Sequence, residues 1–135
     1  MNWSFYVKLY LCTVPVFFLI DIVWLGVLAK GFYRKHLESV INLSVNWPAA
    51  IVFYLLFIAG ILLFAVVPAL DKQSWYRAVL LGGLFGLFTY ATYDLTNLAT
   101  IKGWPMTVVL VDILWGITLC ATVATASYAL GNWLK

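Results

Sequence analysis

Four long apolar stretches alternate with short segments that hold most of the charged residues. The stretches run from about residue 5 to 29, from 49 to 70, from 78 to 101 and from 106 to 134. Each can cross a hydrocarbon core of about 30 Å as a helix, which satisfies its own backbone hydrogen bonds in lipid. The pattern predicts an all-α, polytopic membrane protein, in which residues 1–135 form one transmembrane domain, a four-helix bundle.

Composition narrows the class of protein further. Of the 135 residues, 65% are hydrophobic and 10% are charged, whereas soluble domains are about half apolar and a quarter charged. This excess of hydrophobic residues excludes a soluble globular domain and a disordered chain. The net charge of +3 is scattered along the chain, without the basic cluster of a nucleic-acid-binding surface. The expected partner is therefore the lipid bilayer, and nucleic acid is not expected.

Basic residues leave the orientation in the membrane open. Four fall on each side of the predicted bundle, so the positive-inside rule gives no preference. The even number of spans places both termini on one side, and the balanced count is compatible with an antiparallel homodimer. The two sets are Lys8, Lys72, Arg77 and Lys135 on the side of the termini, and Lys30, Arg34, Lys35 and Lys102 on the other side.

Two similar segments indicate that a helical hairpin is duplicated. Residues 21–26 and 94–99 both begin with Asp, and each is followed by a Lys-Gly-aromatic sequence, at 30–32 and 102–104. A Trp-Pro pair then opens the next span in each half. Because the first and third spans would run in the same direction, the pattern predicts a parallel repeat. Chance similarity between short apolar motifs is the alternative.

Tryptophan and proline residues lie close to the predicted helix ends. Five tryptophans have the positions expected of an interfacial aromatic belt. Pro48 and Pro105 fall in the first turns of the second and fourth helices, where a missing N–H has no cost. The predicted belt residues are Trp3, Trp47, Trp75, Trp104 and Trp133.

Three of the five acidic residues, Asp21, Asp94 and Asp112, lie inside predicted helices. An ionised Asp near a helix centre costs about 2.5 to 3.5 kcal/mol on insertion scales, so these side chains should avoid lipid. Each lies about 12 Å, at 1.5 Å per residue, from a Lys or Trp that marks its helix end, and the three ends share one side of the membrane. We therefore predict that the three carboxylates point inward at a common depth.

Aromatic and polar side chains recur within four residues of these carboxylates, and those at spacings of three or four, Trp24, Tyr90, Asn97 and Trp115, share a helix face with them. The indole N–H groups among them can donate to buried acceptors. Gly83 and Gly86 continue the face of Asp94, and small residues there would let helices approach closely. The predicted supporting residues are Trp24, Tyr90, Tyr93, Thr96, Asn97 and Trp115.

Carboxyl groups that meet in a poorly hydrated site cannot all be ionised, so they keep a proton or surround a cation. The leading hypothesis is a site that binds or translocates a proton or another cation, alone or coupled to a small solute. A divalent cation bound by Asp21, Asp94 and Asp112 is the candidate cofactor. One alternative is a metal-assisted intramembrane enzyme that acts on lipid. Another is a structural or accessory subunit whose Asp–Trp pairs only fix helix packing.

The first loop, residues 30–48, leaves the first span on the side where the carboxylates lie. Tyr33, Arg34 and His36 are candidates for binding a lipid headgroup or for shuttling a proton. The alternative is a partly interfacial amphipathic segment with solvated charges. Catalytic residues are not assigned.

The run from Tyr93 to Thr100, followed by residues 103–105 and Asp112, forms a recognisable motif that extends to Asp21 and to residues 31–37. With these motifs the chain resembles an uncharacterised family of bacterial membrane proteins, the domain-of-unknown-function family twenty-one seventy-seven. The resemblance covers nearly the whole chain. It implies a small multi-pass protein of the bacterial cytoplasmic (inner) membrane, and it implies no particular activity.

Overall fold

The computed structural model describes residues 1–41 and 44–135, which form helices and turns without a β-strand. Four continuous helical segments are long and apolar enough to span a membrane, and their ends lie within three residues of the predicted ones. The predicted all-α membrane bundle with four spans is therefore confirmed. The elements are α1 (Trp3–Val23), η1 (Trp24–Leu28), α2 (Phe32–Leu37), α3 (Trp47–Ile61), η2 (Leu62–Val66), α4 (Val67–Asp71), α5 (Trp75–Thr100) and α6 (Met106–Leu134).

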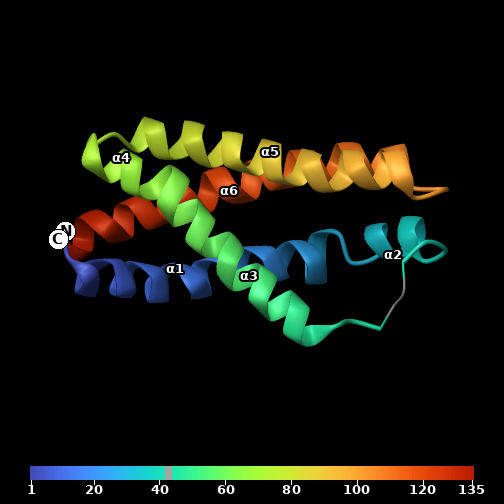
Figure 1. The fold of residues 1–135 in the computed structure, drawn as a ribbon, viewed down its shortest axis with the longest axis horizontal. Coiled ribbons are helices and arrows are strands. Elements are labelled where there is room, and N and C mark those ends of the chain that lie inside the picture. Colours follow the sequence, from blue (N-terminus) through green and yellow to red (C-terminus); the bar gives the residue numbers. More distant parts are fainter. Residues whose placement is uncertain (42–43) are drawn as a thin grey trace.

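The first and second spans contain π-helical turns. The segment η1 continues α1, and η2 joins α3 to α4, so each span is one continuous helical rod of mixed geometry. Figure 1 shows the N- and C-termini together at one end of the bundle, and α2 and the turn between α5 and α6 at the other end. The prediction that both termini share one side is thus confirmed.

Local sequence explains where the spans begin. The side chains of Asn2, Asn46 and Ser74 each accept a hydrogen bond from the backbone N–H three residues later, which satisfies a donor that the helix itself leaves free. Pro48 lies in the first turn of α3, as predicted. Pro105 is instead the extended residue immediately before α6, so its predicted place in the first turn was wrong by one position.

The pair α5 and α6 is the most closely packed part of the bundle. A Cβ atom built on Gly86 would lie 2.1 Å from the carbonyl oxygen of Gly116, and one on Gly82 would lie 2.6 Å from that of Cys120. Gly83 has more room, since its nearest neighbour would be 3.7 Å away. The close helix approach predicted at Gly86 is therefore observed. The other glycine in contact with α6 is Gly82 rather than the predicted Gly83, because Gly83 is turned further from α6.

Two apolar cores of unequal size lie along the bundle. The larger one fills the half that holds the termini, and it includes Leu9, Phe17, Ile58, Ile61, Leu119 and Val123. Within this half, the buried hydroxyl groups of Thr13 and Ser127 join α1 to α6 at 2.7 Å. The smaller core, at the opposite end, consists of Leu37, Trp104, Val108 and Val109. Polar side chains with a functional role would have to lie between these two cores.

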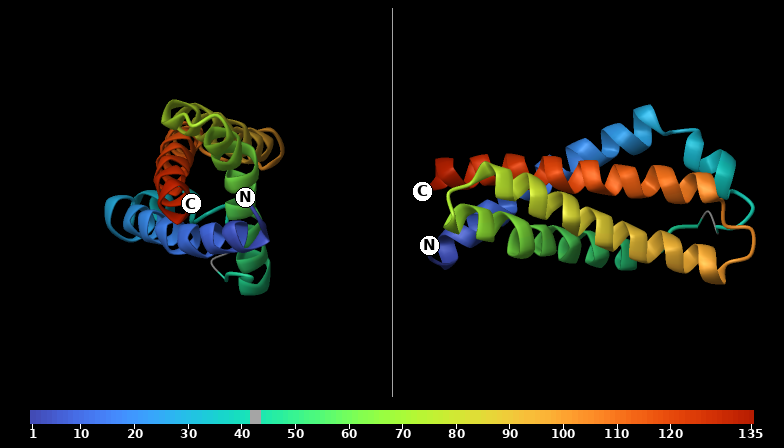
Figure 2. Two further views of the ribbon diagram at one scale, coloured as in Figure 1. Left: turned by 90° about the vertical axis from the view of Figure 1, so that its left-hand side faces the viewer. Right: turned by 90° about the horizontal axis from the view of Figure 1, so that it is seen from above.

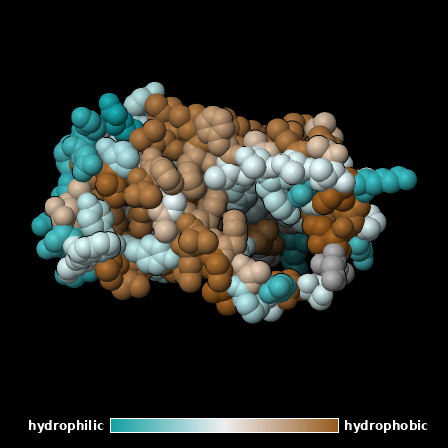
Figure 3. All heavy atoms as spheres, viewed as in Figure 1, coloured by the Kyte–Doolittle hydropathy of each residue, from teal (hydrophilic) through white to brown (hydrophobic). Residues whose placement is uncertain are grey.

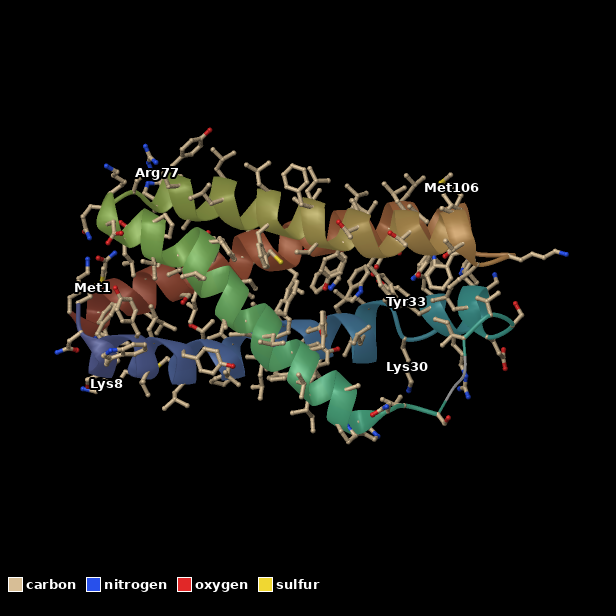
Figure 4. The ribbon with its side chains drawn as sticks, viewed as in Figure 1. Met1, Lys8, Lys30, Tyr33, Arg77 and Met106 are labelled. Carbon is tan, nitrogen blue, oxygen red and sulfur yellow. The ribbon has the colours of Figure 1, made fainter. Side chains whose placement is uncertain are left out.

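The face of the bundle shown in Figure 3 is largely apolar along the spans. Side chains that face outward are largely exposed in the isolated chain, which suits contact with acyl chains rather than water. Examples are Leu11, Leu19, Leu56, Leu63, Leu110 and Leu114. The basic side chains lie toward the two ends, with Lys8 and Arg77 at the end that holds the termini and Lys30 toward the other (Figure 4).

Candidate functional site: a carboxylate and aromatic cavity

A cavity of about 180 Å³ lies between the two cores. All four spans and α2 contribute side chains to its wall, and the three intramembrane aspartates are among them. The three carboxyl groups that were predicted to share one depth thus line the same cavity. The lining residues are Asp21, Trp24, Leu25, Tyr33, Leu37, Tyr54, Tyr90, Tyr93, Asp94, Trp104, Val108, Asp112 and Trp115.

Asp94 is the most deeply placed of the three aspartates. Its side chain is fully buried, at 0% exposure, and neither of its carboxyl oxygens has a hydrogen-bond partner among the described residues. The carboxyl group of Asp112, on the neighbouring helix α6, lies close to it in the same cavity wall. Two carboxylates are both acceptors, so the contact becomes a hydrogen bond only when one of them carries a proton.

Two stacked tryptophans connect the other two aspartates. The rings of Trp24 and Trp115 lie 4.4 Å apart at an interplanar angle of 8°. The indole N–H of Trp115 donates to Asp21 at 3.4 Å, across from α6 to α1. The indole N–H of Trp24 donates to the hydroxyl of Tyr33 at 3.1 Å, and that hydroxyl donates to Asp112 at 2.9 Å. Each tryptophan thus serves the aspartate of the opposite helix rather than the one three residues before it.

Of the predicted residues in the first loop, only Tyr33 reaches the cavity. Figure 4 shows it at the α2 end of the molecule. Burial, and next the negative charge of Asp112, raise the pKa of Tyr33 above its usual value, so its hydroxyl stays a donor at neutral pH. Arg34 is exposed. His36 contacts the carbonyl oxygen of Phe32 in its own helix at 2.9 Å, and neither basic residue lines the cavity.

The predicted supporting residues divide into two groups. Tyr90 and Tyr93 line the cavity together with the two tryptophans. The ring of Tyr90 fits against Gly116, where a Cβ atom would lie 2.2 Å from it. Thr96 is exposed, and its hydroxyl donates to the carbonyl of Thr92 in its own helix. Asn97 is half-buried and lies outside the lining residues, but its side chain contacts that of Tyr93 in the cavity wall.

Five cavity residues were not predicted as part of the site, and two of them, Tyr54 and Trp104, carry polar groups. Tyr54 of α3 places its hydroxyl beside Asp21. It lies seven residues after Trp47, so the depth calculation used for the aspartates could have found it. Trp104 was assigned to the interfacial belt, but it is only 6% exposed and its indole N–H has no partner among the described residues. The turn between α5 and α6 directs this ring inward, which sequence position alone does not show.

The three carboxylates share a cavity without converging on one point. Within residues 1–41 and 44–135, no three side chains of the types His, Cys, Asp and Glu lie close enough together to hold a metal ion. A hard divalent cation requires several oxygen ligands at short, nearly equal distances. The described residues therefore do not fit the divalent cation that the sequence suggested as a cofactor.

An apolar groove of about 730 Å³ adjoins the cavity. It shares Tyr90, Tyr93 and Asp112 with the cavity wall, and it is otherwise lined by Phe53, Phe57, Phe88, Thr89 and Thr92. These residues belong to α3, α5 and α6. Figure 1 shows that α3 diverges from α5 toward the α2 end, and Figure 3 shows the surface hollowed there. The groove therefore opens on the side of the bundle that would face lipid.

Fold and site together define a polytopic α-helical membrane protein with a polar, aromatic cavity lined by all four spans. A family described as "predicted membrane protein (DUF2177)" matches residues 6–129, and the chain belongs to this family. No curated protein and no solved structure matches the chain.

Proposed function

We propose that this protein binds a monovalent cation in exchange for a proton, within the cavity lined by Asp21, Asp94 and Asp112. The observation that carries the proposal is the environment of Asp94: a fully buried carboxyl group without a hydrogen-bond donor, close to a second carboxyl group. Two such groups in a poorly hydrated place cannot both be ionised unless a positive charge lies between them. A proton and a cation are therefore alternative occupants of the same site.

The charges around the cavity support this exchange. None of its lining residues is Lys, Arg or His, so no positively charged side chain in the described wall neutralises the aspartates. The donors Trp115 and Tyr33 are directed at Asp21 and Asp112. Asp94 is the carboxyl group that the protein leaves without a partner, and it is the one where a cation would gain most by replacing a proton.

The environment of Asp94 also bears on the accessory-subunit alternative. A residue retained only to fix helix packing would be expected to make an interhelical hydrogen bond from a donor to its carboxylate. Asp94 makes none with the described residues. The metal-assisted enzyme gains no support either, because the His, Cys, Asp and Glu side chains described do not form a ligand cluster. Cation–proton exchange is the function that the arrangement supports best.

The family resemblance supports a proposal for the membrane in which this exchange would occur. We place the protein in the bacterial cytoplasmic membrane, where a proton gradient is available to drive exchange. Translocation would further require that the cavity open alternately to both sides. A homodimer is the assembly in which a chain of four spans could supply a second wall for such a pathway.

Proton release by purified protein tests the proposal. Addition of Na⁺, K⁺ or tetramethylammonium to protein in weakly buffered neutral detergent should release about one proton per cation bound. Affinity should fall as the pH is lowered, because protons compete for the same carboxyl groups. The other titratable groups that line the cavity with Asp94 and Asp112 are Asp21, Tyr33, Tyr54, Tyr90 and Tyr93.

The variant Asp94→Asn keeps the shape of the side chain and removes its charge. We expect it to lose at least about tenfold in cation affinity, about 1.4 kcal/mol, and to release no proton. Asp71→Asn is the matched control, since Asp71 is exposed at the opposite end of the bundle. Proton release that is unchanged in Asp94→Asn, or absent from the wild type with every cation, would contradict the proposal.

A further inference from the structure

The walls of the cavity favour one kind of cation over another. The stacked rings of Trp24 and Trp115 line the same space as Tyr54, Tyr90 and Trp104. Aromatic faces attract ammonium groups through their quadrupoles, and quaternary ammonium is often recognised by such a cage of rings. A small metal ion gains more from several converging oxygens, which the described residues do not provide.

The size of the cavity limits how much of a ligand it can hold. Its volume of about 180 Å³ is below the range of about 300 to 1,000 Å³ that is typical for drug-sized ligands. The adjoining groove is about four times larger, and its lining includes Phe53, Phe57 and Phe88. Asp112 and Tyr90 lie in both walls. A ligand with a small charged head and an apolar body would fit the two spaces together.

The route of entry points to the same chemistry. On the side of the aqueous boundary the cavity is covered by the smaller core, in which Leu37, Trp104 and Val108 are each less than 9% exposed. On the side of the lipid, Phe53 and Phe88 at the groove are more than half exposed. A ligand that is already dissolved in the bilayer can therefore approach between α3 and α5 without crossing a sealed layer of side chains.

We infer that the ligand is a hydrophobic organic cation, an ammonium group attached to one apolar chain, which enters laterally from the membrane. Its head would lie among the aspartates and aromatic rings of the cavity, and its chain in the groove lined by Phe53, Phe57 and Phe88. This inference rests on the proposed cation–proton exchange and names its substrate class. An aminophospholipid fits less well, because its phosphate would meet three carboxyl groups and no Lys, Arg or His in the described cavity wall.

Three soluble probes separate the parts of this inference. Protein in nanodiscs of zwitterionic lipid is titrated with octyltrimethylammonium, tetramethylammonium and octyl sulfate, and quenching of tryptophan fluorescence is followed. We expect octyltrimethylammonium to bind about a hundredfold more tightly than tetramethylammonium, because its chain adds apolar contact in the groove. Octyl sulfate should not bind, because the cavity repels anions. Equal binding of the two ammonium ions, or binding of octyl sulfate, would overturn the inference.

A variant in the groove sharpens the test without touching the carboxylates. Phe88→Ala removes an exposed ring, so the fold should be retained, which circular dichroism can verify. We expect about fivefold weaker binding of octyltrimethylammonium and unchanged binding of tetramethylammonium. Leu114→Ala is the control, since Leu114 is equally exposed on α6 but lines neither space. Equal losses in the two variants would contradict a chain-binding groove.

Outcomes of the two sets of experiments distinguish the two proposals. If Na⁺ or K⁺ releases protons and no alkylammonium ion binds, the exchange function stands and its substrate class is wrong. If no cation releases a proton, the exchange function fails, and the lateral entry of a cation fails with it. A nanodisc that contains phosphatidylethanolamine tests the lipid source. Competition by this lipid against octyltrimethylammonium would show that a headgroup, rather than a free amine, occupies the cavity and would overturn the inference.

Discussion

The two helical hairpins of this chain are built differently. In the C-terminal hairpin, α5 and α6 run side by side, joined by a short turn over residues 101–105, and their backbones touch at Gly86 and Gly116. In the N-terminal half, α1 and α3 are joined by a long connection that contains α2, and both spans include a π-helical segment. Figure 2 shows α3 inclined to its neighbours, whereas α5 and α6 approach each other most closely at Gly82 and Gly86.

From this difference we expect the two walls of the cavity to differ in rigidity. The C-terminal hairpin supplies Asp94 and Asp112, whose relative position is fixed by the glycine contacts. The N-terminal half supplies Asp21, Tyr33 and Tyr54, each from a different element. A carboxyl pair that must hold or release a proton needs constant geometry, while the wall that admits a ligand needs freedom to move. If the two hairpins arose by duplication, they would since have taken separate roles. The duplication itself stays a prediction.

The largest effect is expected when the rigid hairpin is forced apart. Gly86→Ala places a methyl group 2.1 Å from the carbonyl oxygen of Gly116, and a backbone oxygen cannot move aside as a flexible side chain would. We expect a loss of about 3 kcal/mol in stability, at the upper end of the cost of overpacking. Thermal unfolding in detergent measures it. Gly26→Ala is the control, because nothing lies within 4 Å of the new methyl group, and similar losses in both variants would show that the contact is not tight.

The glycines also show what the sequence could and could not predict about the fold. Apolar length alone located all four spans, because lipid requires about twenty residues per helix. The side of α5 that faces α6 was assigned to Gly83, whereas Gly82 makes the contact. Neighbouring helical residues differ by about 100° in direction. In a helix that is apolar nearly all round, no pattern of hydrophobicity decides between two such positions.

A smaller effect is expected when the N-terminal wall is detached from the carboxyl pair. Tyr33→Phe removes a hydroxyl that accepts from Trp24 and donates to Asp112. Loss of two hydrogen bonds in a half-buried position should cost about 1 to 2 kcal/mol. Thermal unfolding measures the loss, and Tyr76→Phe, at an exposed position on α5, is the control. A variant as stable as the wild type would show that α2 does not hold this wall in place.

The same tyrosine predicts a dependence on alkaline pH. Burial and the charge of Asp112 raise the pKa of Tyr33 in the folded protein, while an unfolded tyrosine titrates near its usual value of about 10. Its contribution to stability is therefore complete below about pH 10 and is lost as the pH rises further. The difference in melting temperature between wild type and Tyr33→Phe should shrink above about pH 10. A constant difference would mean that the hydroxyl is not held as a donor.

The sequence predicted how deep along the helices the site residues lie, but it did not predict which way their side chains point. Counting residues from the helix ends placed Asp21, Asp94 and Asp112 at one level, and all three line one cavity. Local spacing paired each tryptophan with the aspartate of its own helix, but the observed donors cross to the other helix. Which side chains meet depends on helix rotation, which packing decides. For the same reason the inward turn of Trp104 could not be read from its position beside a proline.

The smallest effect is expected at the hydrogen bond that joins α1 to α6 beside the larger core. Ser127→Ala removes the buried hydrogen bond at 2.7 Å to Thr13, but the hydroxyl of Thr13 keeps its bond to the carbonyl of Leu9 at 2.8 Å. The cost should be about 0.6 kcal/mol, the average for interhelical hydrogen bonds in membranes. Thr118→Ala, whose hydroxyl bonds only within α6, serves as the control in the same unfolding measurement.

Cation binding should be unchanged in Ser127→Ala, because Thr13 and Ser127 belong to the part of the bundle that is filled by the larger core and do not line the cavity. A loss as large as that of Gly86→Ala would mean that α1 is held to α6 as tightly as α5 is. The N-terminal wall would then be rigid too, and lateral entry between α3 and α5 would have to depend on movement of α3 alone.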